Sequence, residues 1–243
     1  TGIPILTLLL FLAAGFFLPL FPLSMGVNWL LQQAADGDYP QLARPGIRLA
    51  LLVGLPLLGI GCLLLGLALA GEQSAQPLLL GFAFWGALSS VFYAFRLLSA
   101  RDGRIWIAQL YSSALALIWI GLAQGVDPLP PTLGLIAALL PLLWLFERLR
   151  ERFGIARSGL HPGLGVRMPR FSALFVAAVL FAVAVPLSPA FLALVDLAFA
   201  GDGHLEWLML LPIGLSWLFW TWAGINLLTG IVFGVPREDL AYR

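Results

Sequence analysis

Few side chains in this sequence are both reactive and placed within its long apolar stretches. Asp196 lies in the run "ALVDLAF", and the adjacent residues Tyr111 and Ser112 lie in "AQLYSSALALI". A carboxylate in an apolar medium is costly and is usually kept for proton transfer, whereas hydroxyl groups can hydrogen-bond between packed helices. Asp196 could therefore carry protons, or it could lie at a polar surface close to Asp202. For Tyr111 and Ser112 we expect helix-to-helix hydrogen bonds rather than ion binding.

The other reactive residue types do not form a catalytic or metal-binding group. The one cysteine, Cys62, lies in an apolar run, and the two histidines, His161 and His204, fall in different connecting segments. A single cysteine excludes an internal disulfide and a cysteine-based metal site, and isolated histidines are poor candidates for ligating haem. No set of nucleophile, base and orienting group converges. We therefore expect a chain that is not an enzyme and holds no metal or cofactor.

The composition predicts a membrane protein. The chain has 243 residues, of which 61% are hydrophobic and 10% are charged, whereas a soluble domain carries about 25% charged residues. Seven segments are apolar enough to span a bilayer, which takes about 20 residues. They lie at 3–33, 46–70, 77–99, 104–124, 130–147, 171–199 and 206–233. The first lacks a basic leader, so we take it as a membrane segment rather than a cleaved signal. The sequence thus predicts an all-α integral membrane protein with a single transmembrane domain over 1–243.

The basic residues predict an orientation. All 13 are arginine, and each lies at the same side of the seven segments, while the connectors on the other side hold acidic residues. Because basic residues concentrate on the cytoplasmic side of membrane proteins, we expect a multi-pass protein of the cell's inner membrane with its N-terminus outside and its C-terminus in the cytoplasm. The stretch with Arg148, Arg150, Arg152 and Arg157 would then contact anionic lipid or a soluble partner.

Two of the seven segments contain a pair of prolines. Pro19 and Pro22 interrupt the first segment, and Pro186 and Pro189 interrupt the sixth. Proline inside a helix removes a backbone hydrogen bond and costs about 3 kcal/mol or more. In lipid, a broken helix is tolerated only where protein or a watery cavity covers the freed groups, and in transporters such breaks mark ion pathways. The pairs predict two broken helices, either on an ion pathway or as kinks packed against a neighbour.

Aromatic residues crowd the last segment. Trp207, Trp217, Trp220 and Trp222 fall within it. Tryptophan is enriched at membrane interfaces, so we expect some of these residues to be interface anchors and the rest to contact another subunit.

Five stretches, in order along the chain, resemble the antiporter-like, proton-pumping membrane subunits of respiratory complex I, which are related to Mrp-type antiporters and to membrane subunits of inorganic-carbon uptake complexes. The stretch "LFLAAGFFLPLFPLSMGVNWL" is similar to a broken helix of that family. Later helices are matched by "SARDGRIWIAQLYSSALALIWIGLA" and "TLGLIAALLPLLWLFERL". A second broken helix is matched by "VRMPRFSALFVAAVLFAVAVPLSPAFLALVDLAF", and the segment after the next helix by "GIVFGVPREDL". The resemblance implies that the chain corresponds to helices seven to thirteen of such a subunit.

The resemblance also implies where pathway charges belong. Phe17 and Leu57 stand where the family carries lysines, and Ser24 and Leu133 stand where it carries histidines. Asp196 lies two residues past the expected charge of the second broken helix, and the chain contains no lysine. Titratable groups with shifted pKa values are what load and release protons. We therefore expect the broken scaffold to be present without most of its proton relay.

These observations favour an accessory or structural antiporter-like subunit of a proton-coupled membrane complex, which does not pump by itself. A complex I-like, an Mrp-like or an inorganic-carbon (CO2 or bicarbonate) uptake assembly is compatible with the motifs. The expected partners are other antiporter-like membrane subunits, a cytoplasmic subunit and lipid, but not nucleic acid. The alternative is the C-terminal half of a split, active subunit that moves protons or cations through Asp196, with Ser24, Tyr111 and Ser112 as further pathway candidates.

Overall fold

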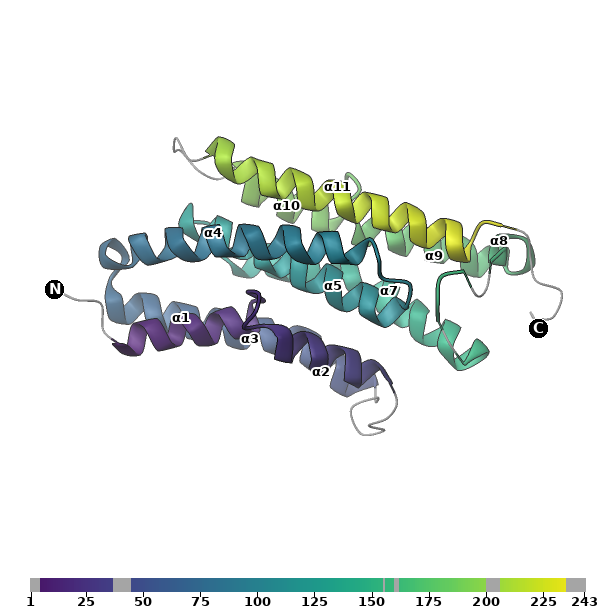
Figure 1. Cartoon of the computed structure of the whole chain (residues 1–243), viewed down its shortest axis with the longest axis horizontal. Coiled ribbons are helices and arrows are strands. Elements are labelled where there is room, and N and C mark those ends of the chain that lie inside the picture. The colour runs from purple at the N-terminus through teal and green to yellow at the C-terminus, as the bar shows by residue number, and fades with distance from the viewer. Residues whose placement is uncertain (1–4, 37–44, 155, 160–161, 200–205, 235–243) are drawn as a thin grey trace.

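The fold is a bundle of helices that run along one long axis (Figure 1). The computed structural model describes residues 5–36, 45–154, 156–159, 162–199 and 206–234, and no strand occurs among them. The helices are α1 (Ile5–Phe17), α2 (Met25–Asp36), α3 (Pro45–Ala70), α4 (Glu72–Leu97), α5 (Gly103–Ala116), α6 (Ile118–Ala123), α7 (Leu129–Phe153), α8 (Leu164–Arg167), α9 (Pro169–Ala182), α10 (Pro189–Phe199) and α11 (Glu206–Ile231).

The helices match the predicted membrane segments. Five stretches of the described chain are long and apolar enough to cross a membrane, with α5 and α6 counted as one. The first segment consists of α1 and α2, with Pro19 and Pro22 between them, and the sixth consists of α9 and α10. Pro186 lies in this second gap and Pro189 begins α10. The prediction of an all-α membrane fold with two broken helices is confirmed.

The continuous pair α5 and α6 forms the centre of the bundle. In the most apolar part of this segment, 94% of the stretch is buried inside the bundle. Helices α2, α4, α7 and α10 pack against it. Small residues at a helix interface let backbones approach closely. At Gly86 of α4, an added Cβ would lie 2.6 Å from the Ala116 carbonyl oxygen, so this crossing requires glycine.

The other helices pack around this centre in pairs. Helix α1 packs along α3, α11 packs along α4, and α7 packs along α9 and α10. Aromatic rings fill the space beneath the first break: Phe82 stacks on Trp119 with ring centroids 4.9 Å apart, and Phe11 meets Phe82 edge-on at 5.4 Å. The first break is therefore enclosed on its inner side by packed side chains.

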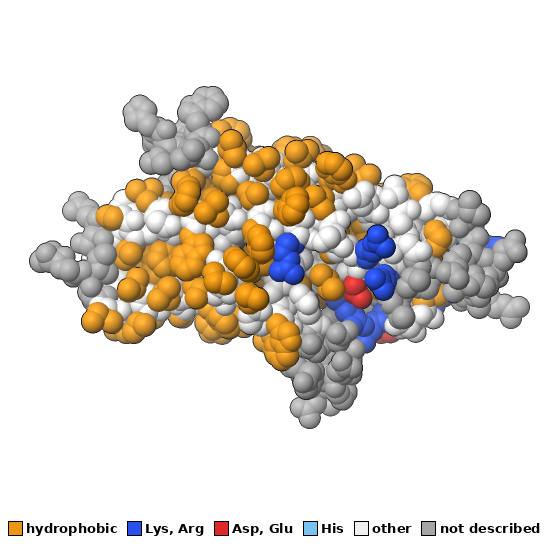
Figure 2. All heavy atoms as spheres, viewed as in Figure 1, with side chains coloured by type: hydrophobic (Ala, Val, Ile, Leu, Met, Phe, Trp, Pro, Cys, Tyr) orange, Lys and Arg blue, Asp and Glu red, His pale blue; other side chains and the backbone are white. Residues whose placement is uncertain are grey.

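The two ends of the bundle differ in charge. We call the end where α4 finishes and α5 begins the arginine end, and the opposite end, with Asp127 and Asp196, the acidic end. On the face shown in Figure 2, hydrophobic side chains cover the left and centre, and arginine side chains gather to the right. A broad apolar belt with charges at its edge is what a membrane-embedded surface requires.

Candidate functional site

The first helix break leaves a carbonyl group that a neighbouring helix satisfies. Pro22 has no N–H, so it cannot donate a helical hydrogen bond to the oxygen of Leu18, four residues earlier. The indole Nε1 of Trp119 donates to this oxygen at 3.2 Å. Both Leu18 and Trp119 are fully buried, so the indole replaces the missing donor where water is excluded.

The peptide groups of Phe21 in the same break are satisfied by α4. The Phe21 N–H donates to Ser89 Oγ at 3.0 Å, and the Phe21 carbonyl accepts from Trp85 Nε1 at 2.5 Å. An unpaired buried backbone group costs about 1–3 kcal/mol. The freed groups of the first break are thus covered by protein side chains.

The second break is covered in the same way by α11. Trp217 Nε1 lies 3.1 Å from both the Val183 and the Ala184 carbonyl oxygens. Ala184 has a left-handed φ of 59°, and the break ends where Ser188 Oγ accepts from the Phe191 N–H at 3.1 Å. Ser188 is therefore the N-cap of α10.

One hydroxyl contact between sequence neighbours of the break-binding residues connects the two breaks. Ser89, which binds the first break, is followed in sequence by Ser90, whose hydroxyl lies 2.8 Å from that of Ser216. Ser216 is followed by Trp217, which binds the second break. All the side chains of this connection are uncharged, and the three serines are buried. Helices α4 and α11 hold both breaks through adjacent residues.

A second row of polar side chains extends from the first break along α2. Ser24 Oγ lies 2.6 Å from the Tyr93 hydroxyl, Asn28 Nδ2 donates to Ser112 Oγ at 2.6 Å, and Gln32 Nε2 donates to Asn28 Oδ1 at 3.1 Å. Ser24 and Ser112, both predicted from the sequence, therefore lie in one row but bond to different partners. These groups are uncharged amides and hydroxyls, and they donate and accept hydrogen bonds among themselves.

Tyr111 satisfies a carbonyl group freed by another proline. Pro56 lies inside α3 and cannot donate to the Leu52 oxygen four residues earlier. The Tyr111 hydroxyl donates to that oxygen at 3.1 Å. Tyr111 thus makes the helix-to-helix hydrogen bond expected from the sequence.

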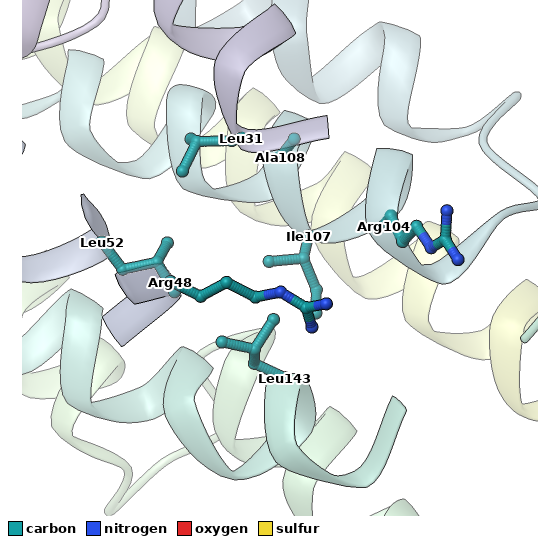
Figure 3. A pocket seen from close by; sticks show the side chains of 7 residues that line it. All are labelled: Leu31, Arg48, Leu52, Arg104, Ile107, Ala108 and Leu143. Carbon is teal, nitrogen blue, oxygen red and sulfur yellow. The ribbon is translucent and has the colours of Figure 1, made fainter. Parts of the chain in front are cut away.

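An ion pair lies at the arginine end of this row. Arg48 Nη1 pairs with Glu147 Oε1, and the two side chains are 10% and 16% exposed. Arg48 also lines a cavity of about 30 Å³, enough for about one water molecule. Figure 3 shows the Arg48 side chain reaching toward Ile107 and Leu143, with Arg104 beside the cavity. Among the described residues, Arg48 is the one charged residue that is buried.

Asp196 lies at the acidic end, on the outside of the chain. Asp196 is exposed and lines a cavity of about 360 Å³ together with Asp127. The Asp127 carboxylate accepts a hydrogen bond from the Leu129 N–H at 3.0 Å, at the start of α7. Within the described residues, no group of histidine, cysteine and acidic side chains could hold a metal ion. The predicted pathway residue Asp196 is therefore not brought together with Ser24, Tyr111 or Ser112.

The four arginines singled out from the sequence lie at the arginine end. Arg148 pairs with Glu151 at 2.8 Å on the exposed face of α7, Arg150 is partly buried, and Arg152 and Arg157 are exposed. The backbone of Arg157 pairs with that of Asp102 at the start of α5. Arg148 and Arg152 also line an open cavity of about 330 Å³ with Met168 and Phe171.

Two of the positions that the resemblance aligns with pathway charges face outward. Leu57 and Leu133 are 38% and 43% exposed. Leu194, which stands at the expected charge of the second broken helix two residues before Asp196, is 5% exposed, and Phe17 is partly buried. In the isolated chain, the side chains of Leu57 and Leu133 therefore lie on the surface of the bundle rather than in its interior.

Several functional contacts were not predicted from the sequence. We expected some tryptophans of the last segment at membrane interfaces and the rest at a contact with another subunit. Instead, Trp217 covers the second break, and Trp220, fully buried, donates to Ser113 Oγ at 2.8 Å. The partners Trp85, Trp119 and Tyr93 were also missed. The proline rule could have named Leu18 and Leu52 as acceptors, but it does not say which donor reaches them.

Comparisons with known proteins find the same fold in two membrane complexes. A chain of respiratory complex I from Thermus thermophilus matches 97% of this chain with 26% sequence identity and a TM-score of 0.62. A chain of the Mrp complex from Dietzia sp. DQ12-45-1b matches 96% of it with 17% identity and a TM-score of 0.60. No family model and no curated protein sequence matches the chain. This chain corresponds to 50% and 51% of the lengths of those two chains.

Proposed function

We propose, from the premise that this chain has the fold of an antiporter-like membrane subunit, that it is an accessory or structural subunit of a proton-coupled membrane complex and does not translocate protons by itself. In this role the chain catalyses no reaction. Its task is to hold neighbouring membrane subunits in place.

One observation carries this proposal: the polar groups at the two breaks and along α2 are uncharged and hydrogen-bonded, and the buried charge of Arg48 is paired with Glu147. Tryptophan, serine and tyrosine side chains bind the backbone freed at the two breaks and at Pro56. The row from Ser24 to Gln32 is bonded to Tyr93 on α4 and to Ser112 on α5. Proton transfer through a membrane ordinarily uses buried ionisable groups. A set of neutral groups with committed hydrogen bonds favours a fixed scaffold over a proton relay.

The expected neighbours follow from the fold and the charge pattern. Antiporter-like subunits occur in complexes, so the proposed partners include at least one further antiporter-like membrane chain. With the arginine end in the cytoplasm, the N-terminus lies outside, and Arg148 and Arg152 on α7 face lipid or a cytoplasmic subunit. A complex I-like, an Mrp-like and an inorganic-carbon uptake assembly remain the candidates.

Affinity purification from native membranes tests this function. The tagged chain is solubilised in mild detergent, and the co-purifying chains are identified by mass spectrometry. The proposal expects a longer antiporter-like subunit in near-equal amount. Redox subunits would assign the complex I-like assembly, cation-exchange subunits the Mrp-like one, and a large soluble zinc protein the carbon-uptake one. Recovery of the chain without membrane partners would contradict the proposal.

The second candidate function is an active half-subunit that uses Asp196. The observation in its favour is the cavity of about 360 Å³ that Asp196 shares with Asp127 at the acidic end. This candidate requires a second chain that covers Asp196 and connects it to polar groups. Proton flux that disappears in the Asp196→Asn variant would favour it.

A further inference from the structure

A cavity of about 330 Å³ lies at the arginine end, where α4 finishes beside the last turns of α11. Its polar lining comes from Arg101, Ser158 and Asn226. Its apolar walls are Leu97, Leu98, Ala223 and Leu227. None of the lining residues is acidic. The cavity is separate from the two breaks and from the Arg48–Glu147 pair.

Three hydrogen-bond donors of this cavity have no partner among the described residues. The Arg101 guanidinium makes no ion pair there, and the hydroxyl of Ser158 and the side-chain amide of Asn226 make no hydrogen bond there. Two other arginines at this end do have partners: Arg96 lies over the Phe92 ring, and Arg148 forms an ion pair with Glu151. Guanidinium, hydroxyl and amide groups together suit the oxygens of a phosphate group.

Backbone hydrogen bonds fix the polar wall of the cavity. The Ser158 N–H donates to the Arg101 carbonyl at 2.7 Å, and the Gly159 N–H donates to the Gly230 carbonyl at 2.9 Å. The segment that carries the Ser158 hydroxyl is therefore tied to the end of α4 and to the end of α11. The backbone that carries Arg101 and Ser158 is therefore held in place before a ligand arrives, which lowers the cost of binding.

An apolar path leads from the cavity toward the middle of the bundle. Phe95 lies one turn before Leu98 on α4, and Trp222 lies one turn before Asn226 on α11, so they share the faces that line the cavity. These side chains are 62% and 56% exposed. Phe95 also meets Phe219 edge-on across the two helices, at 6.0 Å between centroids. A hydrocarbon chain can lie against these rings.

We propose that this cavity binds the headgroup of an anionic phospholipid, with the phosphate at Arg101, Ser158 and Asn226 and an acyl chain along Phe95 and Trp222. The lipid would fill the groove between α4 and α11, the two helices that hold the breaks. The inference does not depend on whether protons cross this chain. A free phosphate shares the polar chemistry but does not use the apolar path.

Lipid binding to the purified chain tests the site. The tagged chain, with the chains that co-purify with it, is washed free of lipid in detergent, and phosphatidylglycerol binding is measured by native mass spectrometry. Arg101→Ala should weaken binding at least about tenfold, the effect of about 1.4 kcal/mol, and Arg101→Lys should retain most of it. Arg170→Ala is the matched control, because Arg170 is an exposed arginine near the start of α9, at the same end, and does not line this cavity.

Four outcomes would overturn the inference. Equal binding by the wild type and Arg101→Ala would remove Arg101 from the site, and an equal loss in Arg170→Ala would indicate general surface charge. Phosphatidylcholine binding as tightly as phosphatidylglycerol would remove the preference for an anionic headgroup. Displacement of the lipid by an equal concentration of glycerol phosphate would assign the cavity to a free phosphate. If Arg101→Ala does not fold, weaker binding in a folded Asn226→Ala variant supports the site, and unchanged binding overturns it.

Discussion

Replacing Trp217 by phenylalanine removes the donor that covers the second break. The indole N–H of Trp217 lies 3.1 Å from the carbonyl oxygens of Val183 and Ala184, and both of these residues are buried. An unpaired buried group costs about 1–3 kcal/mol, and single hydrogen bonds between membrane helices have been worth about 0.6–1.7 kcal/mol. Because one N–H is shared by two carbonyls, we expect a loss of about 1.5 kcal/mol, or about tenfold in the unfolding constant.

The assay is reversible unfolding in mixed micelles with increasing denaturing detergent. Trp222→Phe is the matched control, because Trp222 lies on the same helix, is 56% exposed and makes no indole hydrogen bond within the described residues. We expect Trp222→Phe to change the free energy of unfolding by less than about 0.5 kcal/mol. Equal losses in the two variants would refute the assignment of Trp217 as the cover of the break.

The remaining predictions concern the other polar contacts. Tyr111→Phe should lower the free energy of unfolding by about 1 kcal/mol, but by much less in a Pro56→Ala background, where residue 56 regains the N–H that binds the Leu52 oxygen; additive losses in the double variant would contradict this pairing. Glu147→Gln should destabilise the chain by about 3 kcal/mol because it leaves the buried Arg48 charge without its carboxylate, while Glu151→Gln, at the exposed pair, should cost less than about 0.5 kcal/mol; similar unfolding midpoints would count against a buried ion pair. Asp196→Asn should leave the ion-coupled activity of the whole complex at the wild-type rate, and loss of that activity would favour the half-subunit alternative.

The sequence was sufficient to predict the helices and their breaks, because both depend on local signals. An apolar run of membrane length predicts a helix, and two prolines spaced three apart predict a break in that same helix. Both interruptions were therefore identified from Pro19, Pro22, Pro186 and Pro189. The order of motifs also predicted the fold shared with the complex I and Mrp chains.

The contacts that satisfy the breaks could not be predicted, because they join residues far apart in the sequence. Trp119 and Leu18 are separated by 101 positions, and Ser90 and Ser216 by 126. A tryptophan in an apolar segment can lie at a membrane interface, contact another subunit or act as a buried hydrogen-bond donor. For Trp217 and Trp220, the packing of α11 against α4 determines which of these roles the side chain takes. The exposure of Leu57 and Leu133 likewise depends on how α3 and α7 are rotated within the bundle.

Proton flux through the purified chain tests the central claim most directly. The chain is reconstituted in sealed liposomes with a trapped pH dye, and a pH gradient is imposed with a potassium diffusion potential. The account predicts that the gradient decays as slowly as in empty liposomes, because the polar groups at the breaks and along α2 are uncharged and hydrogen-bonded, and the buried Arg48 is paired with Glu147. Faster decay in the wild type that returns to the empty-liposome rate in Asp196→Asn would contradict it.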